Sequence, residues 1–85
     1  MPNRRSQALT VARGRRTARA MAQAGNALLD AGQLKEAVDS YLKVLAIQPD
    51  YAEAYNNMGH ALQELGKLKE AIASFQKCLV IRPNY

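Results

Sequence analysis

The 85-residue chain contains one cysteine, one histidine and no tryptophan, and it has no long hydrophobic run. A single cysteine, Cys78, cannot form a disulfide within the chain, so the sequence does not indicate an oxidising compartment. One histidine and one cysteine are too few for a tetrahedral metal site. No apolar segment approaches the roughly 18 residues that a membrane-spanning helix needs. We therefore expect no metal, no cofactor, no transmembrane segment and a cytoplasmic location.

Motifs that support catalysis are missing as well. The sequence has no phosphate-binding glycine loop and no nucleophile elbow. A catalytic pair of Cys78 and His60 is conceivable, but Cys78 falls on the apolar stripe of its predicted helix. Buried thiols in apolar surroundings are inert, so we interpret Cys78 as a packing residue. The sequence predicts no catalytic residue and a protein that is not an enzyme.

Acidic residues are absent from the first 19 positions, which hold six arginines and account for the net charge of +5. Pro2 and Asn3 argue against helix at the very start. Three interpretations of this segment remain open: a flexible, solvated tail or helical cap that covers the first hairpin, an arm that binds nucleic acid or anionic lipid, and an organelle-targeting peptide. The candidates for contact with an anionic partner are Arg4, Arg5, Arg13, Arg15, Arg16 and Arg19.

Residues 52–85 predict a helical hairpin. Apolar side chains recur at steps of three and four residues, pause at Gly66-Lys67, and resume until the chain reaches Pro83. The two-residue break makes the helices run antiparallel, and the proline disfavours helix in the residue before it.

The same pattern occurs twice, with a period of 34 residues. Residues 18–51 and 52–85 align without gaps, and 16 of the 34 pairs are identical. Unrelated helices would not keep glycine, alanine and proline in register, so this is an internal repeat. Gly32 and Gly66 suit left-handed termination of a helix. Gly25 and Gly59 lie in mid-helix, which indicates close approach of a neighbouring helix.

The repeat resembles the tetratricopeptide repeat family, whose pattern is W-x2-L-G-x2-Y, then A-x3-F, then P. The matching residues are Tyr55, Met58, Gly59, Leu62, Ala71, Phe75 and Pro83 in the second copy, and Met21, Ala24, Gly25, Leu28, Ala37, Tyr41 and Pro49 in the first. The resemblance implies an all-α fold, a right-handed α-solenoid. Its parts are two antiparallel helical hairpins, residues 18–51 and 52–85, preceded by a basic leader, residues 1–17, that is helical or partly disordered. Tyr41 and Phe75 are expected to fill the space between the hairpins.

Stacked hairpins of this kind curve, and their first helices line a concave surface that binds protein partners. An amide side chain carries a donor and an acceptor, so it can pair with the backbone of an extended peptide of any sequence. The family resemblance places Asn57 where long superhelices, similar to those of glycosyltransferases, carry a groove asparagine. Ala22 and Asn56 replace the lysine of the family's carboxylate clamp, so acidic C-terminal tails are not expected as ligands.

We predict that a peptide or helix binds in this groove, although a solvated helix face is the alternative interpretation. The groove candidates are Asn57, Asn56, His60, Gln63, Asn26 and Gln23.

The last helix carries an apolar stripe that nothing later in the sequence covers. Repeat arrays generally need about three units and polar capping helices. Exposing two large apolar side chains forgoes about 3–6 kcal/mol, comparable to the stability of a small domain. We therefore expect a homo-oligomer, a dimer or larger, joined through Phe75, Leu79 and Val80. A structural element that only oligomerises through such ends, with an unused groove, is the second hypothesis for function.

Overall fold

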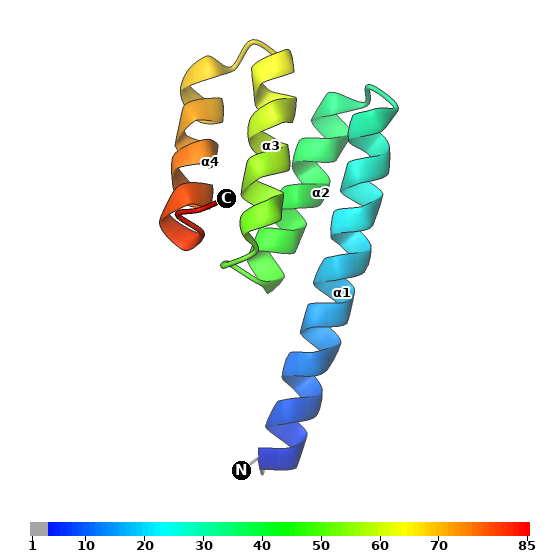
Figure 1. The fold of residues 1–85 in the computed structure, drawn as a ribbon. Coiled ribbons are helices and arrows are strands. Elements are labelled where there is room, and N and C mark those ends of the chain that lie inside the picture. The colour runs from blue at the N-terminus through cyan, green and yellow to red at the C-terminus, as the bar shows by residue number, and fades with distance from the viewer. Residues whose placement is uncertain (1–3) are drawn as a thin grey trace.

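The computed structural model describes residues 4–85, which form four helices and no strand (Figure 1). The helices are α1 (Arg4–Asp30), α2 (Leu34–Ile47), α3 (Ala52–Glu64) and α4 (Leu68–Ile81). α1 packs along α2, α2 along α3 and α3 along α4, so two helical hairpins stand side by side. The all-helical fold of two hairpins is confirmed. The expectation for Pro2 and Asn3 lies outside the described residues.

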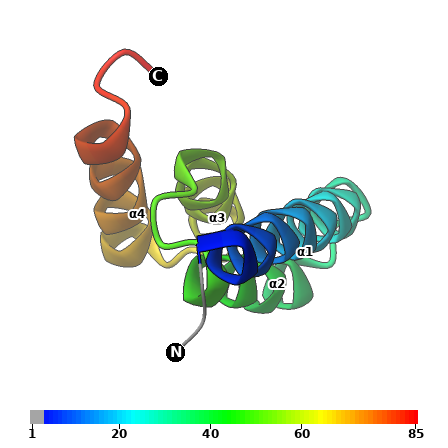
Figure 2. The same ribbon diagram turned by 90° about the horizontal axis from the view of Figure 1, so that it is seen from below.

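α1 has 27 residues, about twice as many as any other helix, because the basic leader continues directly into the first hairpin. Gly14 lies within α1 and does not end it. The first half of α1 projects beyond the ends of α2 and α3 (Figure 1), so in the view from below its start lies in front of these two helices (Figure 2). We call residues 4–17 the arm. Its residues are exposed except Ala12 and Gly14, which are half-buried.

Each hairpin turns at a glycine with a left-handed backbone. The φ angle is +77° at Gly32 and +79° at Gly66, where a residue with a Cβ atom would be strained. In both turns the residue after the glycine donates its amide hydrogen bond to the leucine carbonyl five positions earlier, at 2.9 Å. This is the Schellman geometry, so the predicted left-handed termination is confirmed.

The core is built largely from small side chains, which allow the helices to approach closely. Its buried apolar residues are Ala18, Ala22, Ala37, Tyr41, Val44, Ala52, Ala54, Met58, Ala61, Leu62, Ala71 and Cys78. The interpretation of Cys78 as a packing residue is confirmed. Ala22, which aligns with the lysine of the family's clamp, belongs to the core, and Ala24, which replaces the leucine of the family pattern, is exposed.

An aromatic ring of the second helix lies against a glycine of the first helix in each hairpin. A methyl group in place of the Gly25 hydrogen would lie 2.8 Å from the Tyr41 ring, and one at Gly59 would lie 2.6 Å from the Phe75 ring. The predicted close approach is therefore confirmed. Phe75 packs within its own hairpin, so the expectation that it fills the space between the hairpins is wrong. Tyr41, its counterpart in α2, is fully buried in a core cluster that includes Ala54 and Met58 of the second hairpin.

Substituting Gly25→Ala should lower the free energy of unfolding by about 1–2 kcal/mol, although alanine favours helix over glycine by about 1 kcal/mol. Tyr41 cannot move aside, because it is fully buried and hydrogen-bonded. Gly59→Ala should be nearly neutral, because Phe75 is only half-buried and can swing outward.

Gly14→Ala is the matched control for this pair. Its methyl group would lie 3.6 Å from Ile47, an ordinary contact, so the variant should gain up to about 1 kcal/mol. Urea unfolding followed by circular dichroism measures all three variants. Equal free energies of unfolding for Gly25→Ala and Gly14→Ala would contradict the packing of Tyr41 against Gly25.

Candidate functional site

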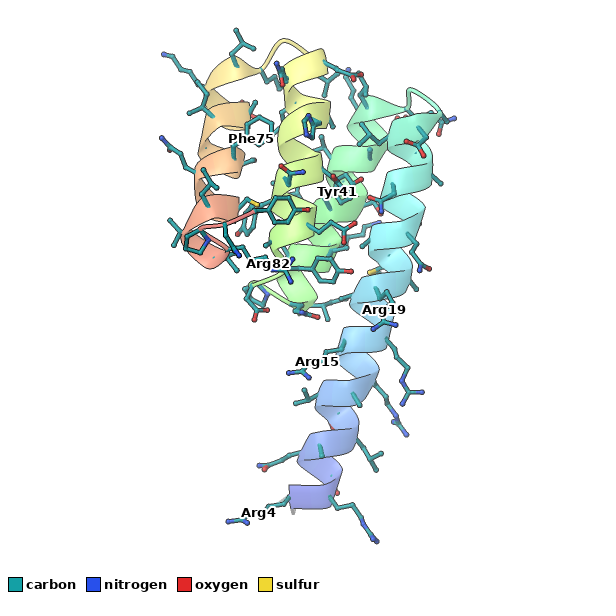
Figure 3. The ribbon with its side chains drawn as sticks, viewed as in Figure 1. Arg4, Arg15, Arg19, Tyr41, Phe75 and Arg82 are labelled. Atoms are coloured by element: carbon teal, nitrogen blue, oxygen red, sulfur yellow. The ribbon has the colours of Figure 1, made fainter. Side chains whose placement is uncertain are left out.

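A hydrogen-bonded amide pair links the first helices of the two hairpins. Asn57 in α3 donates from Nδ2 to Oδ1 of Asn26 in α1, at 2.9 Å. The hydroxyl of Tyr41, from α2, donates to the same oxygen at 2.6 Å. The Oδ1 atom of Asn26 therefore links α1 to both α2 and α3. Figure 3 shows Tyr41 reaching from α2 toward this place, between α1 and α3.

Tyr41 stays a neutral donor at physiological pH. Burial raises the pKa of Tyr41 to about 12, and the carboxylates of Glu53 and Asp30 act in the same direction. The amide of Asn57 hydrogen-bonds the tyrosine oxygen as well, and this contact opposes the rise in pKa. The hydroxyl thus lies between both amides and holds them in place.

Each amide keeps one polar group available for a ligand. Asn26 keeps its Nδ2 donor and Asn57 keeps its Oδ1 acceptor, and neither group is bonded within the described chain. Both residues are only half-buried, so the two groups can be reached from solvent. An extended peptide presents alternating N–H and C=O groups, which such a donor and acceptor can pair with. Because the network already fixes both side chains, little conformational entropy remains to be lost on binding.

The other predicted groove residues lie on the same two helices. His60 is exposed, and its ring meets Phe75 edge-on with the ring centres 5.2 Å apart. Asn56, His60 and Gln63 follow one another at steps of four and three residues, which places them on one side of α3. Gln23 is exposed on α1, three positions before Asn26. The structure brings only Asn26 and Asn57 into direct contact.

Comparison with known families gives two matches. The family model described as TPR repeat matches residues 25–66, and the one described as tetratricopeptide repeat matches residues 52–85. The chain belongs to the tetratricopeptide repeat family. Tetratricopeptide repeats generally mediate protein–protein interactions and are typically not enzymes, so a protein partner is expected. No curated protein matched the sequence.

The sequence alone did not predict that Tyr41 takes part in the hydrogen-bonded amide network. It assigned this residue to packing alone, because its position in the repeat is filled by Phe75 in the second copy. Tyr41 differs from Phe75 by one hydroxyl group, and this difference between the two copies was the signal in the sequence that could have indicated a polar role. That hydroxyl is the only part of the side chain that serves the amide pair.

The arginine arm precedes the tetratricopeptide hairpins and keeps its charge unneutralised. The five arginines of the arm and Arg19, which follows it, are all exposed, and none forms an ion pair with a carboxylate in residues 4–85. Arg4, Arg15 and Arg19 project from α1 along its length (Figure 3). A cleft of about 520 Å³ separates the arm from the loop between α2 and α3, with Val11, Gly14, Ile47 and Pro49 in its walls.

The candidates for self-association lie on α4. Leu79 is 49% exposed and Val80 is 78% exposed, whereas Phe75 is half-buried against Gly59 and His60. Two further apolar side chains of α4, Leu68 and Ile72, are also exposed and were not among the predicted candidates.

The part of the chain that the structure describes contains no cluster of metal ligands and no helix suited to a membrane span. No group of three or more His, Cys, Asp or Glu side chains there could hold a metal ion. None of its helices combines the length and the apolar composition needed to cross a membrane. Burial raises the pKa of the Cys78 thiol, which Arg82 partly opposes, and a thiol in this state is a poor nucleophile.

Proposed function

We propose that the inner face formed by α1 and α3 binds an extended peptide segment, or a helix, of another protein. The chain then acts as a non-enzymatic interaction module. The observation that carries this proposal is the Asn26–Asn57 pair, which is held by Tyr41 and offers one free donor and one free acceptor at the surface. Membership in the tetratricopeptide repeat family supports it.

The chemistry of the face favours recognition of the peptide backbone. Its candidate residues are five neutral amide side chains and one imidazole, with no arginine or lysine among them. Amides pair with main-chain groups whatever the ligand's side chains are. Binding at this face should therefore change little with salt concentration, unlike binding of an anionic partner to the arm.

A library of random peptides of about 12 residues, displayed on phage and selected against the full chain, tests the proposal. The affinity of selected peptides should fall about tenfold in Asn57→Ala, because the variant loses both the free acceptor and the support of Asn26. Asn84→Ala makes the same chemical change outside the groove and should leave the affinity unchanged. Circular dichroism verifies that both variants are folded.

Two results would count against groove binding. One is a set of selected peptides whose affinity does not change in Asn57→Ala. The other is a set whose binding disappears when the arm is deleted and weakens steeply with salt, since that behaviour belongs to charge attraction by the arginines.

Self-association through α4 is the second candidate function. It is supported by the exposure of four large apolar side chains on one helix, Leu68, Ile72, Leu79 and Val80, at 49–78%. Removal of such side chains from water is the usual driving force for association. The face of α4 does not include the amide pair, so both functions can coexist in one chain.

A further inference from the structure

The internal repeat shows what should cover the exposed face of α4. Three apolar positions of α2 are half-buried, because α3 packs against α2. The same positions of α4, 34 residues later, are 49–59% exposed. These positions are Leu34, Val38 and Leu45 in α2, and Leu68, Ile72 and Leu79 in α4. The two faces carry nearly the same side chains, and only one of them is covered.

Val80 does not belong to this face. Its counterpart in the first copy, Ala46, is exposed even though α3 covers α2. The exposure of Val80 therefore gives no information about a missing neighbour, whereas that of Ile72 and Leu79 does.

α1 likewise exposes a face that is buried in its counterpart, α3. In α3, Ala54 and Ala61 are fully buried and Met58 is 6% exposed, because a hairpin precedes them in space. The counterparts of these residues in α1 are all exposed, and so is the counterpart of Asn57. These four exposed residues of α1 are Ala20, Ala27, Ala24 and Gln23. α1 thus resembles α3 with its neighbour removed.

We infer that α1 of a second copy of this chain covers the α4 face, so that the packing of α2 against α3 is repeated between chains. This inference rests on the self-association put forward above as the second candidate function. In the stack, Gln23 of the incoming copy takes the place of Asn57, and His60 takes the place of Asn26. An amide therefore again meets a hydrogen-bonding side chain across the junction. Within the chain, a loop precedes α3, whereas the arm precedes α1 of the incoming copy. The arm needs the space at the end of α4, so the residues after α4 turn aside in the stack.

One charge at the junction has the opposite sign to its counterpart within the chain. Glu53, at the start of α3, lines a cleft of about 210 Å³ together with Gln48 from the loop before it and Arg82 from the end of α4. The corresponding residues of the stack are Arg19 of the incoming copy and Arg82, so two cations meet there. Their repulsion weakens the stack at low salt, and screening by added salt strengthens it.

The stack joins two different surfaces, so each copy keeps one face free and association continues as the concentration rises. A symmetric pairing of α4 with α4 would stop at the dimer. This difference allows the geometry to be tested with the full chain by sedimentation velocity, using two exposed positions at which substitutions should not disturb folding.

Ile72→Lys blocks the α4 face and Ala24→Lys blocks the α1 face. Each variant alone should be monomeric at concentrations where the unsubstituted chain grows beyond the dimer, with self-association weakened about tenfold or more. An equimolar mixture of the two should form one-to-one dimers and nothing larger, because each variant keeps one intact face. Ala8→Lys, the same change on the arm as Ala24→Lys, should associate like the unsubstituted chain.

Arg19→Glu provides a gain of association. It restores the charge found at Glu53 and should tighten self-association about fivefold at low salt, whereas Arg5→Glu, the same change on the arm, should leave it unchanged. An unchanged Arg19→Glu, a monomeric mixture of the two lysine variants, or a dimer formed by Ala24→Lys alone would each overturn the proposed stack. Peptide affinity measured on Ile72→Lys separates this outcome from the groove, because groove binding should survive in that variant.

Discussion

Tyr41→Ala should lower the free energy of unfolding by about 3–5 kcal/mol, the largest effect that we expect from any single substitution in this chain. Tyr41 is the largest fully buried side chain, and its ring fills the space above Gly25. Its removal leaves a cavity and also deprives Asn26 of its shorter hydrogen bond, at 2.6 Å. A domain of this size has only about 5–15 kcal/mol of stability, so much of the chain should unfold at mild urea concentrations.

Two controls set the scale of this effect. Phe75→Ala removes the equivalent ring from the second hairpin and should cost less, because Phe75 is only half-buried. Tyr85→Ala makes the same chemical change at a residue that is 48% exposed, and it should cost at most about 1 kcal/mol. If Tyr41→Ala and Tyr85→Ala unfold at the same urea concentration, the core is not centred on Tyr41.

Alkaline pH should destabilise the chain by about 2–3 kcal/mol through Tyr41 alone. Burial raises the pKa of this side chain from its ordinary value of 10.0 to about 12, so the folded state retains the proton longer than the unfolded state does. Where the folded state binds more protons, stability decreases as the pH rises. The contribution is therefore complete below about pH 10 and is lost between pH 10 and 12.

Tyr41→Phe isolates this effect from the titration of lysines and of the other tyrosines. The variant should be less stable than the unsubstituted chain near neutral pH, by about 1 kcal/mol for the lost hydrogen bond. The difference should shrink, and then reverse, as the pH approaches 12. Urea unfolding at several pH values measures it, and a difference that does not depend on pH would contradict the burial of the hydroxyl group.

The features that the sequence predicted best are those in which a residue type has one dominant structural role. Gly32 and Gly66 predicted left-handed helix ends because only glycine adopts that conformation without strain. Gly25 and Gly59 predicted close packing because glycine is otherwise costly within a helix. Regular spacing then fixed the two hairpins, since a 34-residue period leaves few other folds.

Features that depend on neighbours in space were harder to predict. Ala22 and Ala24 are the same residue type, yet Ala22 belongs to the core cluster whereas Ala24 lies on a side of α1 that none of the described helices covers. Phe75 is apolar and stands on the predicted stripe, but its contact with Gly59 could not be separated from a contact with a partner chain. The bond between Asn26 and Asn57 joins residues 31 positions apart, and no local pattern predicts such a pair.

The central claim, that the face of α1 and α3 around the amide pair is the binding surface, is tested most directly by a two-dimensional NMR titration. The full chain, labelled with ¹⁵N, is titrated with the tightest peptide from the random library. The account predicts that the side-chain amide signals of Asn26 and Asn57 and the backbone signals of His60 shift together, in proportion to the bound fraction and with little dependence on salt. Shifts confined to the arm, or to α4 around Ile72 and Leu79, would contradict it.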